Sequence, residues 1–268
     1  MTNPPATAAT EAAVWERALR ELGTASRAAS EKAYLKSDLE FAGTGVPATR
    51  AHVAAWHKAH PGLAHDDLTG LIEALWQRPL YECRAAAVLL LERSAPLLSP
   101  ADLPLLERLL RTSHTWALVD GLAVNVAGDV AARYPQAGAA LDRWAGDDDF
   151  WLRRSALLAL LRPLRAGGGD FERFARYADT MLTEREFFIR KAIGWVLREV
   201  GKRRPDLVAG WLGPRVHLAA GVTVREAVKP LPAPVRTALL TGYRDKIPIR
   251  WEHDVQTATG CSACPREA

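Results

Sequence analysis

The feature that most constrains this chain is a helical repeat of apolar residues, broken at short intervals by glycine and proline. Apolar residues recur about every 3.6 positions in one segment after another, and no convincing strand alternation appears. The breaks include Gly43-Thr44-Gly45, Pro61-Gly62, Ser99-Pro100, Gly167-Gly168-Gly169 and Gly213-Pro214. We expect helices at 11–22, 28–41, 47–59, 66–77, 80–94, 100–112, 115–133, 135–145, 149–162, 170–182, 185–203, 205–213 and 223–241.

Helices of this length with brief connections bury their apolar stripes against sequence neighbours. The sequence therefore predicts an all-α fold, a curved solenoid of antiparallel helix pairs. One hairpin does not align onto the next by identity, which indicates a degenerate HEAT-like repeat. We expect one helical-repeat domain over residues 11–250, between a flexible N-terminal tail at 1–10 and a C-terminal tail at 251–268.

The sequence carries neither a membrane span nor a secretion signal that we can identify. A spanning helix needs about 20 apolar residues, and the leucine-rich stretch at 85–91 is closed by Glu92 and Arg93. Residues 1–10 lack a basic segment followed by an apolar one. We expect a cytoplasmic protein that does not contact membranes and associates with the nucleoid when bound to DNA.

Metal and cofactor chemistry finds little support in the sequence. Cys261 and Cys264 form a C-x-x-C in the tail, without a second ligand pair, and the remaining cysteine is Cys83. No phosphate-binding glycine loop or nucleophile elbow is present. We expect no metal and no cofactor. Four histidines lie close together in the sequence, but no motif places an acidic partner beside them. We interpret them as surface residues: His52, His57, His60 and His65.

The net charge of +4 is unevenly divided along the chain. Residues 1–134 hold 13 Lys and Arg against 15 Asp and Glu, whereas residues 135–268 hold 22 against 16. The C-terminal half is therefore the better candidate for contact with a polyanion. A solvated basic surface without a partner would give the same counts.

The segment 185–203 is predicted to form a helix with two distinct faces. Its apolar stripe consists of Ile189, Ile193, Val196, Leu197 and Val200. The opposite face carries Lys191, Trp195, Arg198 and Lys202. A neighbouring helix could cover the tryptophan while the cations form a solvated face with ion pairs, for instance to Glu199. Alternatively, the cations neutralise phosphates and the indole packs on a sugar or base.

An arginine interrupts the apolar face of the segment 149–162. Arg154 shares that face with Phe150 and three leucines, and a buried guanidinium needs a carboxylate, a carbonyl or an anion. It either pairs with one of the aspartates at 147–149 or binds a phosphate, which suits its planar fork.

A tryptophan and a carboxylate are helical neighbours at the start of the segment 115–133. Trp116 and Asp120 are spaced i, i+4 and flank an apolar stripe. They fit an ordinary helix start, capped by Thr115 and favoured by an acid near the positive end of the helix dipole. They also fit an aromatic and acidic pair at a binding site.

These segments, in this order and spacing, resemble the AlkD family of DNA glycosylases, which are built from HEAT-like helical repeats. The matching stretches are 34–36 with 41–47, 115–120, 150–156 and 187–195. They cover the chain from about residue 30 to residue 205. The stretch at 187–195 is the most specific. The W-x-x-x-D and F-W-x-R-R motifs are weak evidence individually, and their order and spacing strengthen the resemblance.

The resemblance implies a role for several side chains. Asp120 matches the catalytic carboxylate, Trp116 and Trp195 match the aromatic pair that flanks the deoxyribose of the lesion, and Arg154 matches the arginine that contacts phosphate. All four positions keep the expected residue. We expect further DNA contacts from Tyr34, Lys36, Arg153, Arg190, Lys191, Arg198 and Lys202.

The implied activity is that of a monofunctional alkylpurine DNA glycosylase, acting as a monomer on double-stranded DNA with purines alkylated at N3 or N7. Such a base is cationic and leaves as a neutral molecule, so the enzyme has to stabilise the sugar cation that remains. The resemblance also implies action from the backbone side, without a cavity that encloses the base. Bulky adducts would then be tolerated.

Two other interpretations remain open at this stage. A non-catalytic relative could bind bent or branched DNA, although it should lack the carboxylate or one tryptophan. A HEAT-like scaffold could instead bind a protein, with an affinity that depends less on salt. The residues do not distinguish N3 from N7 lesions, small from bulky ones, or housekeeping repair from self-resistance to an alkylating compound, and they assign no role to the C-terminal tail.

Overall fold

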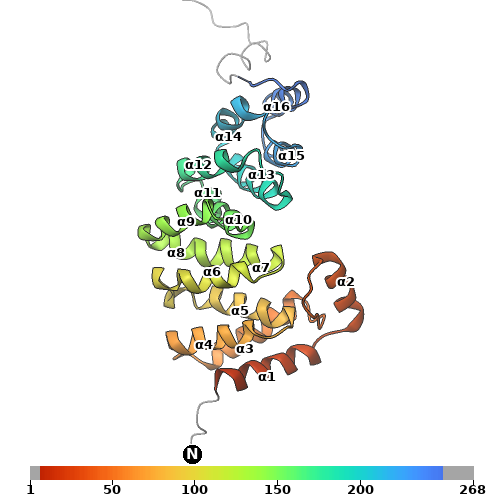
Figure 1. Ribbon diagram of the computed structural model, residues 1–268, viewed down its shortest axis with the longest axis vertical. Helices are drawn as coiled ribbons and strands as arrows, with labels where there is room; N and C mark the ends of the chain where they lie inside the picture. The colour runs from red at the N-terminus through yellow and green to blue at the C-terminus, as the bar shows by residue number, and fades with distance from the viewer. Residues whose placement is uncertain (1–6, 250–268) are drawn as a thin grey trace, which may run out of the picture. The chain divides into compact units, whose positions relative to one another are not determined.

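The computed structural model describes residues 7–249, and its regular elements in this range are helices (Figure 1). One isolated parallel bridge joins Glu40 to Leu80. None of the helices described is long and apolar enough to cross a bilayer. The all-α prediction is therefore confirmed. The two cysteines of the tail lie outside the described residues.

The chain divides into two compact units, one up to Trp144 and one from Ala145. The prediction of a single domain over 11–250 stays a prediction. The α-helices of unit 1 are α1 (Ala8–Glu21), α2 (Ala25–Leu35), α3 (Val46–Ala59), α4 (His65–Trp76), α5 (Tyr81–Arg93), α6 (Leu103–Arg111), α7 (Trp116–Gly121), α8 (Gly128–Arg133) and α9 (Gly138–Ala145). Short 3₁₀ turns join some of them, namely η1 (Ala95–Leu97), η2 (Pro100–Asp102) and η4 (Pro135–Ala137).

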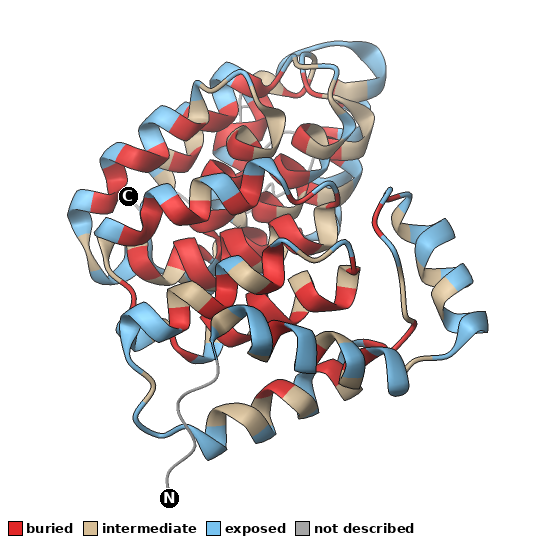
Figure 2. Cartoon of the chain, turned by 60° about the horizontal axis from the view of Figure 1, so that its bottom comes forward, coloured by how far each residue is buried: buried red, intermediate tan, exposed pale blue. Residues whose placement is uncertain are grey.

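Unit 1 is a stack in which helices pack on near neighbours in sequence. Helix α5 contacts α3, α4 and α7, and α4 also contacts α1. The buried faces of these helices are mainly leucine and alanine, and Figure 2 shows burial concentrated on the inward sides of the stack. Because each helix buries one stripe against its neighbours, the 3.6-residue pattern in the sequence translates directly into this architecture.

A π-helix interrupts the segment that was predicted as one helix over 115–133. The π-helix η3 (Leu122–Ala127) joins α7 directly to α8. Its hydrogen bonds span one residue more than those of an α-helix, and such turns often lie at functional sites. Here the π-helix begins two residues after Asp120.

Helix α2 differs from the other α-helices of unit 1 because it has no buried residue. It stands at the edge of the stack, and its residues are exposed or half-buried (Figures 1 and 2). The prediction of a helix to residue 41 is wrong. Helix α2 ends at Leu35 because Lys36 takes a left-handed conformation with φ of 50° and closes the helix.

The loop after α2 is anchored by a buried carboxylate from α5. Glu82 is 1% exposed, and its oxygens accept hydrogen bonds from the backbone N–H groups of Ala42, Gly43 and Thr44, the shortest being 2.6 Å from Gly43. Gly43 has φ of 74°, and a side chain there would meet the backbone of α2. The Gly-Thr-Gly sequence therefore forms an anion-binding turn that ties the end of this loop to α5.

Unit 2 is organised around one long central helix. Its α-helices are α10 (Phe150–Ala159), α11 (Leu161–Arg165), α12 (Phe171–Met181), α13 (Phe187–Gly201), α14 (Pro205–Leu212), α15 (Gly221–Ala227) and α16 (Ala233–Asp245), with the 3₁₀ turn η5 (Gly213–Arg215) after α14. Helix α13 packs on α10, α11, α14 and α15. The five predicted apolar positions of α13 are all fully buried.

Proline accounts for two breaks in unit 2 that the periodicity did not predict. The predicted helix 149–162 ends at Ala159, because Pro163 removes the hydrogen bond to that carbonyl and its ring crowds it. The predicted helix 223–241 is two helices, with Pro230 and Pro232 in the connection. In both places the apolar stripe continues across the break, so the pattern alone suggested one helix.

Candidate functional site

The first turn of α7 brings an aromatic side chain and a carboxylate to one side of unit 1. Trp116 and Asp120 are one helical turn apart, and both are half-buried. The exposed Tyr34 of α2 meets Trp116 edge to face, with ring centroids 5.8 Å apart and planes at 82°. The structure therefore places three of the predicted site residues together, two from α7 and one from α2.

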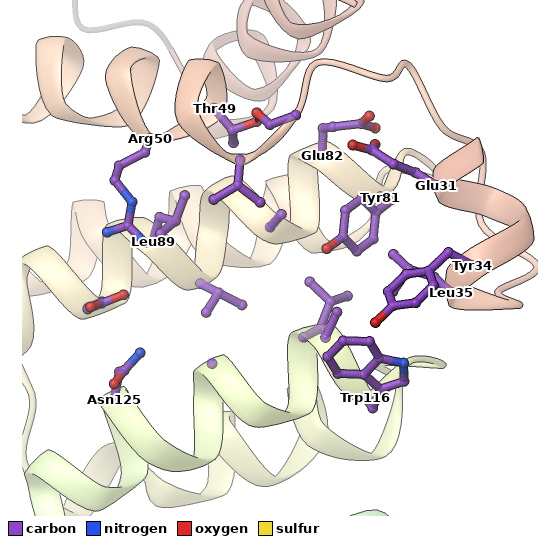
Figure 3. A pocket seen from close by; sticks show the side chains of 18 residues that line it. Glu31, Tyr34, Leu35, Thr49, Arg50, Tyr81, Glu82, Leu89, Trp116 and Asn125 are labelled. Atoms are coloured by element: carbon purple, nitrogen blue, oxygen red, sulfur yellow. Dashed lines mark hydrogen bonds between the residues drawn. The ribbon is translucent and has the colours of Figure 1, made fainter. Parts of the chain in front are cut away.

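Behind Trp116 lies a cavity of about 420 Å³ that the sequence analysis did not predict (Figure 3). Helix α2, α3, α5, α7 and η3 all contribute to its wall. Most of the lining is apolar and includes Ala85, Val88 and Leu89 of α5. Asp120 is not among the lining residues, so the cavity and the carboxylate flank Trp116 separately.

The two ends of the cavity differ in chemistry. Figure 3 shows Tyr34, Tyr81 and Trp116 at one end and Arg50 with Asn125 at the other. Glu92, which also lines the cavity, lies on α5 three residues beyond Leu89. The sequence analysis did not predict the polar end. The one signal for it is Asn125, the single polar residue in the apolar run 122–127.

Ionisable groups at the aromatic end are held in their neutral forms more strongly than usual. Burial raises the pKa of Tyr81 to about 12, and the nearby Glu31 and Glu82 add to the rise. Burial, helped by the negative charge of Glu82, also raises the pKa of Glu31. The Tyr81 hydroxyl is therefore protonated at any pH near neutrality and can donate a hydrogen bond.

In unit 2, Arg154 is buried in α10, at 2% exposure. Its guanidinium donates a hydrogen bond to the backbone carbonyl of Phe188 and lies 5.8 Å from the centre of that ring. Asp149, one of the aspartates considered as its partner, caps α10 by accepting a hydrogen bond of 2.8 Å from the N–H of Trp151. Arg154 thus links α10 to the start of α13.

Arg153 and Arg190 converge on the segment before α13. Arg153 forms a two-pronged ion pair with the carboxylate of Glu184, at 3.0 and 2.9 Å, and also donates to two backbone carbonyls at 147 and 148. Arg190 donates through Nε to the Glu184 carbonyl at 2.6 Å. Both arginines are therefore engaged in holding unit 2 together at this point.

The polar face of α13 mixes half-buried and exposed residues. Trp195 is half-buried, and Lys191 is exposed beside the ring of Phe187, with no acidic partner among residues 7–249. Lys202 contacts both oxygens of Glu199 at 2.8 Å, and Arg198 pairs with Glu199 and with Glu226. Two of the three cations of this face are thus ion-paired through Glu199, as one of the two interpretations expected.

The remaining predicted contact, Lys36, is exposed at the end of α2. Among the histidines, His65 is exposed, as predicted, and it has two acidic partners that no sequence motif indicated. Its Nε2 lies 2.7 Å from Oδ1 of the buried Asp102, and its Nδ1 lies 3.1 Å from Asp66. Within residues 7–249, no group of three His, Cys, Asp or Glu side chains could hold a metal ion.

Comparisons with known proteins agree with this fold. The sequence profile of the DNA alkylation repair enzyme family matches residues 15–231. A solved structure described as a predicted DNA alkylation repair enzyme from Enterococcus faecalis is similar over 79% of this chain and 97% of its own, with a TM-score of 0.72 and 24% identity. AlkD2 from Streptococcus mutans is similar over 70% of this chain and 91% of its own, with a TM-score of 0.55 and 19% identity. No curated protein matches the sequence.

The chain belongs to the family of DNA alkylation repair enzymes, since the family profile covers most of its length. Its fold is that of the AlkD-like helical repeat structures. A role in the repair of alkylated DNA follows from the family, and with it the capacity to bind DNA.

Proposed function

We propose that this protein is a monofunctional alkylpurine DNA glycosylase, which hydrolyses the N-glycosidic bond of purines alkylated at N3 or N7 in double-stranded DNA. One observation carries the proposal. In a member of a DNA alkylation repair family, Trp116 and Asp120 lie half-buried one helical turn apart on α7, and the Trp116 ring meets the ring of Tyr34. An indole and a carboxylate are the groups that a sugar cation needs as neighbours.

The chemistry follows from the positive charge of the alkylated base. When the bond from C1′ to the ring nitrogen breaks, the bonding electrons leave with the base, which becomes neutral, and C1′ becomes cationic. The Asp120 carboxylate stabilises that charge and orients a water, which attacks C1′ and gives up a proton to the carboxylate. The face of the Trp116 indole adds a cation–π contact. No general acid is required for the leaving base.

The residues of unit 2 are assigned roles by the family resemblance. Trp195 contacts the deoxyribose, and Arg154 positions a phosphate of the DNA backbone. Lys191 and Lys36 are exposed, so they are the cations best able to neutralise phosphates. The other predicted cations of unit 2 have protein partners, and they contribute to DNA binding mainly through the electrostatic field that they produce together. They are Arg153, Arg190, Arg198 and Lys202.

Unit 1 contains the cavity of about 420 Å³ behind Trp116, and action without a cavity that encloses the base stays a prediction. The proposed mechanism does not depend on this cavity. Asp120 lies outside the cavity wall, and the sugar cation is the group that requires stabilisation. The protein is therefore proposed to act from the sugar side, as a monomer, without enclosing the base.

The decisive experiment measures release of free base from a duplex that carries one 7-methylguanine, under single-turnover conditions. Asp120→Asn should slow release by about 100-fold or more, because a preorganised negative charge is lost from the transition state. The matched control is Asp67→Asn, an exposed acid in the first turn of α4, which should release base at the wild-type rate.

DNA affinity is measured on the same variants with an undamaged duplex. Wild-type affinity in Asp120→Asn, together with the loss of release, would support the assigned role. Equal release by both Asp120→Asn and the wild-type protein would refute it. Salt-sensitive binding without any release, in the wild-type protein, would instead indicate a protein that binds DNA structure without catalysis.

A further inference from the structure

The cavity of unit 1 has the composition of a binding site for a small organic molecule. Such sites are concave and mostly apolar, with a few polar groups that converge on one place. Here α5 supplies part of the apolar lining, and the polar groups come from three different helical segments: Arg50 of α3, Glu92 of α5 and Asn125 of η3. Its volume of about 420 Å³ falls within the range usual for ligand sites.

The polar side chains at this end of the cavity differ in burial, since Arg50 is exposed whereas Glu92 and Asn125 are half-buried. Among residues 7–249, neither Arg50 nor Glu92 forms an ion pair, and Asn125 makes no side-chain hydrogen bond. Elsewhere in unit 1 arginines commonly have an acidic partner, as Arg20 does with Glu16. A guanidinium, a carboxylate and an amide without protein partners at one end of an apolar cavity provide donors and acceptors for a ligand.

The length of the cavity limits the shape of its occupant. Tyr81, Ala85, Leu89 and Glu92 lie along one face of α5, and the eleven helical steps from Tyr81 to Glu92 span about 16 Å at the rise of an α-helix. A single purine ring system is much shorter than this. The aromatic end, formed by Tyr34, Tyr81 and Trp116, offers ring faces and edges for stacking.

We infer that this cavity binds an elongated planar molecule of two or more aromatic ring systems that carries an amide-like group with both a donor and an acceptor. The rings lie along α5 toward Tyr81 and Trp116. The amide-like group lies at the other end, where its carbonyl accepts from Arg50 and its N–H donates to Glu92. Asn125 can serve either partner.

This chemistry is available from two sources. The molecule is either free, or it is the aromatic part of an adduct already attached to a purine of DNA. The second source rests on the proposed glycosylase function, and the first does not. Because Trp116 borders both the cavity and the carboxylate of α7, an attached aromatic group has a place to go beside the residue proposed to contact the sugar.

The free source is tested with N-(2-naphthyl)indole-2-carboxamide as probe, by fluorescence anisotropy with the full chain. Leu89→Trp adds a bulky ring to the cavity wall and should weaken binding by about tenfold or more, because the indole takes up space that the probe needs. Glu92→Gln and Arg50→Ala should each weaken it by about threefold to tenfold. The matched controls are Leu97→Trp, at an exposed leucine of η1, and Arg93→Ala, at an exposed arginine next to Glu92.

The attached source is tested by base release from two duplexes, one carrying 7-methylguanine and the other 7-(2-naphthylmethyl)guanine. Leu89→Trp should lower the release rate of the naphthylmethyl base relative to that of the methyl base by about tenfold, whereas Leu97→Trp should leave this ratio as in the wild-type protein. An effect in one assay only would support the inference and identify the source.

The inference is overturned if Leu89→Trp matches the wild-type protein in both assays, or if the wild-type protein neither binds the probe nor acts on the naphthylmethyl duplex. Failure of the glycosylase proposal looks different. In that case no base is released from either duplex, while binding of the free probe and its loss in Leu89→Trp still report on the cavity. Far-ultraviolet circular dichroism of each variant shows whether it has folded.

Discussion

The polar face of α13 and the polar end of the unit 1 cavity use their charges in opposite ways. On α13, Arg198 and Lys202 both contact Glu199, which is 6% exposed and also pairs with Arg165. In the cavity, Arg50 and Glu92 line the same space, without an ion pair to any residue in 7–249. Some of the positive charges of the C-terminal half are thus neutralised by acidic residues of the protein itself. Net charge alone therefore does not locate a ligand site.

The largest effect is expected where a buried charge is held by the backbone. Glu82→Ala leaves three backbone N–H groups of the loop after α2 without an acceptor, and the free energy of unfolding should fall by about 3 kcal/mol or more. Urea unfolding followed by circular dichroism measures this. Glu92→Ala, on the same helix but without protein partners, is the matched control and should cost less than about 0.5 kcal/mol.

Releasing the cations of α13 would test the comparison directly. Although burial opposes it, the hydrogen bond from Lys202 and the charges of Arg165 and Arg198 together lower the pKa of Glu199, so Glu199 is ionised at neutral pH. In Glu199→Gln the cations lose their counter-charge, and affinity for undamaged duplex DNA should rise by about tenfold at low salt. Weaker binding in Glu199→Gln would mean that the pairing positions these cations for DNA.

The two lysines of α13 should differ in their contribution to DNA binding. Lys191 has no acidic partner in the described chain, whereas Lys202 contacts Glu199. Lys191→Ala should reduce the slope of log affinity against log salt by about 1, with a smaller change for Lys202→Ala. Titrations of a fluorescent duplex at several salt concentrations measure both slopes. Equal changes would remove the distinction between paired and unpaired cations.

The smallest effect is a pH dependence at His65. Hydrogen bonds to Asp66 and Asp102 raise the pKa of this histidine above its usual value. A raised pKa in the folded state means that the stabilisation is full below the unfolded pKa of about 6.5 and is lost as the pH rises through the folded value. Because the side chain is 44% exposed, solvent screening limits it to a few tenths of a kcal/mol. The unfolding midpoint of the wild-type protein minus that of His65→Gln should shrink between pH 5.5 and pH 8.5.

The fold could be predicted from the sequence because each helix buries one apolar stripe, and the core positions of α13 show this most clearly. The breaks at 160 and at 229–232 were missed because the apolar pattern continues across them, while proline acts on the backbone. The predicted helix at 28–41 extends beyond the end of α2, because that end is set by the left-handed backbone conformation of Lys36 and not by the apolar pattern.

The candidate site was predictable only in part. Trp116 and Asp120 are helical neighbours, so spacing alone places them together. Tyr34 meets Trp116 across 82 positions of sequence, and the cavity is lined by residues from 31 to 125. No local pattern records such a set, because it depends on how α2, α3, α5 and α7 pack.

The π-helix η3 makes the length of the α7 to α8 segment matter as much as its composition. Each residue of an α-helix turns the chain by about 100°. Deletion of one residue within 122–127 would let an ordinary α-helix form, but it would rotate either the face of Trp116 and Asp120 or the buried face of α8. Relatives without the π-helix are therefore expected to show a gap of one residue between the positions of Asp120 and Asp129, and to differ in how they present the carboxylate.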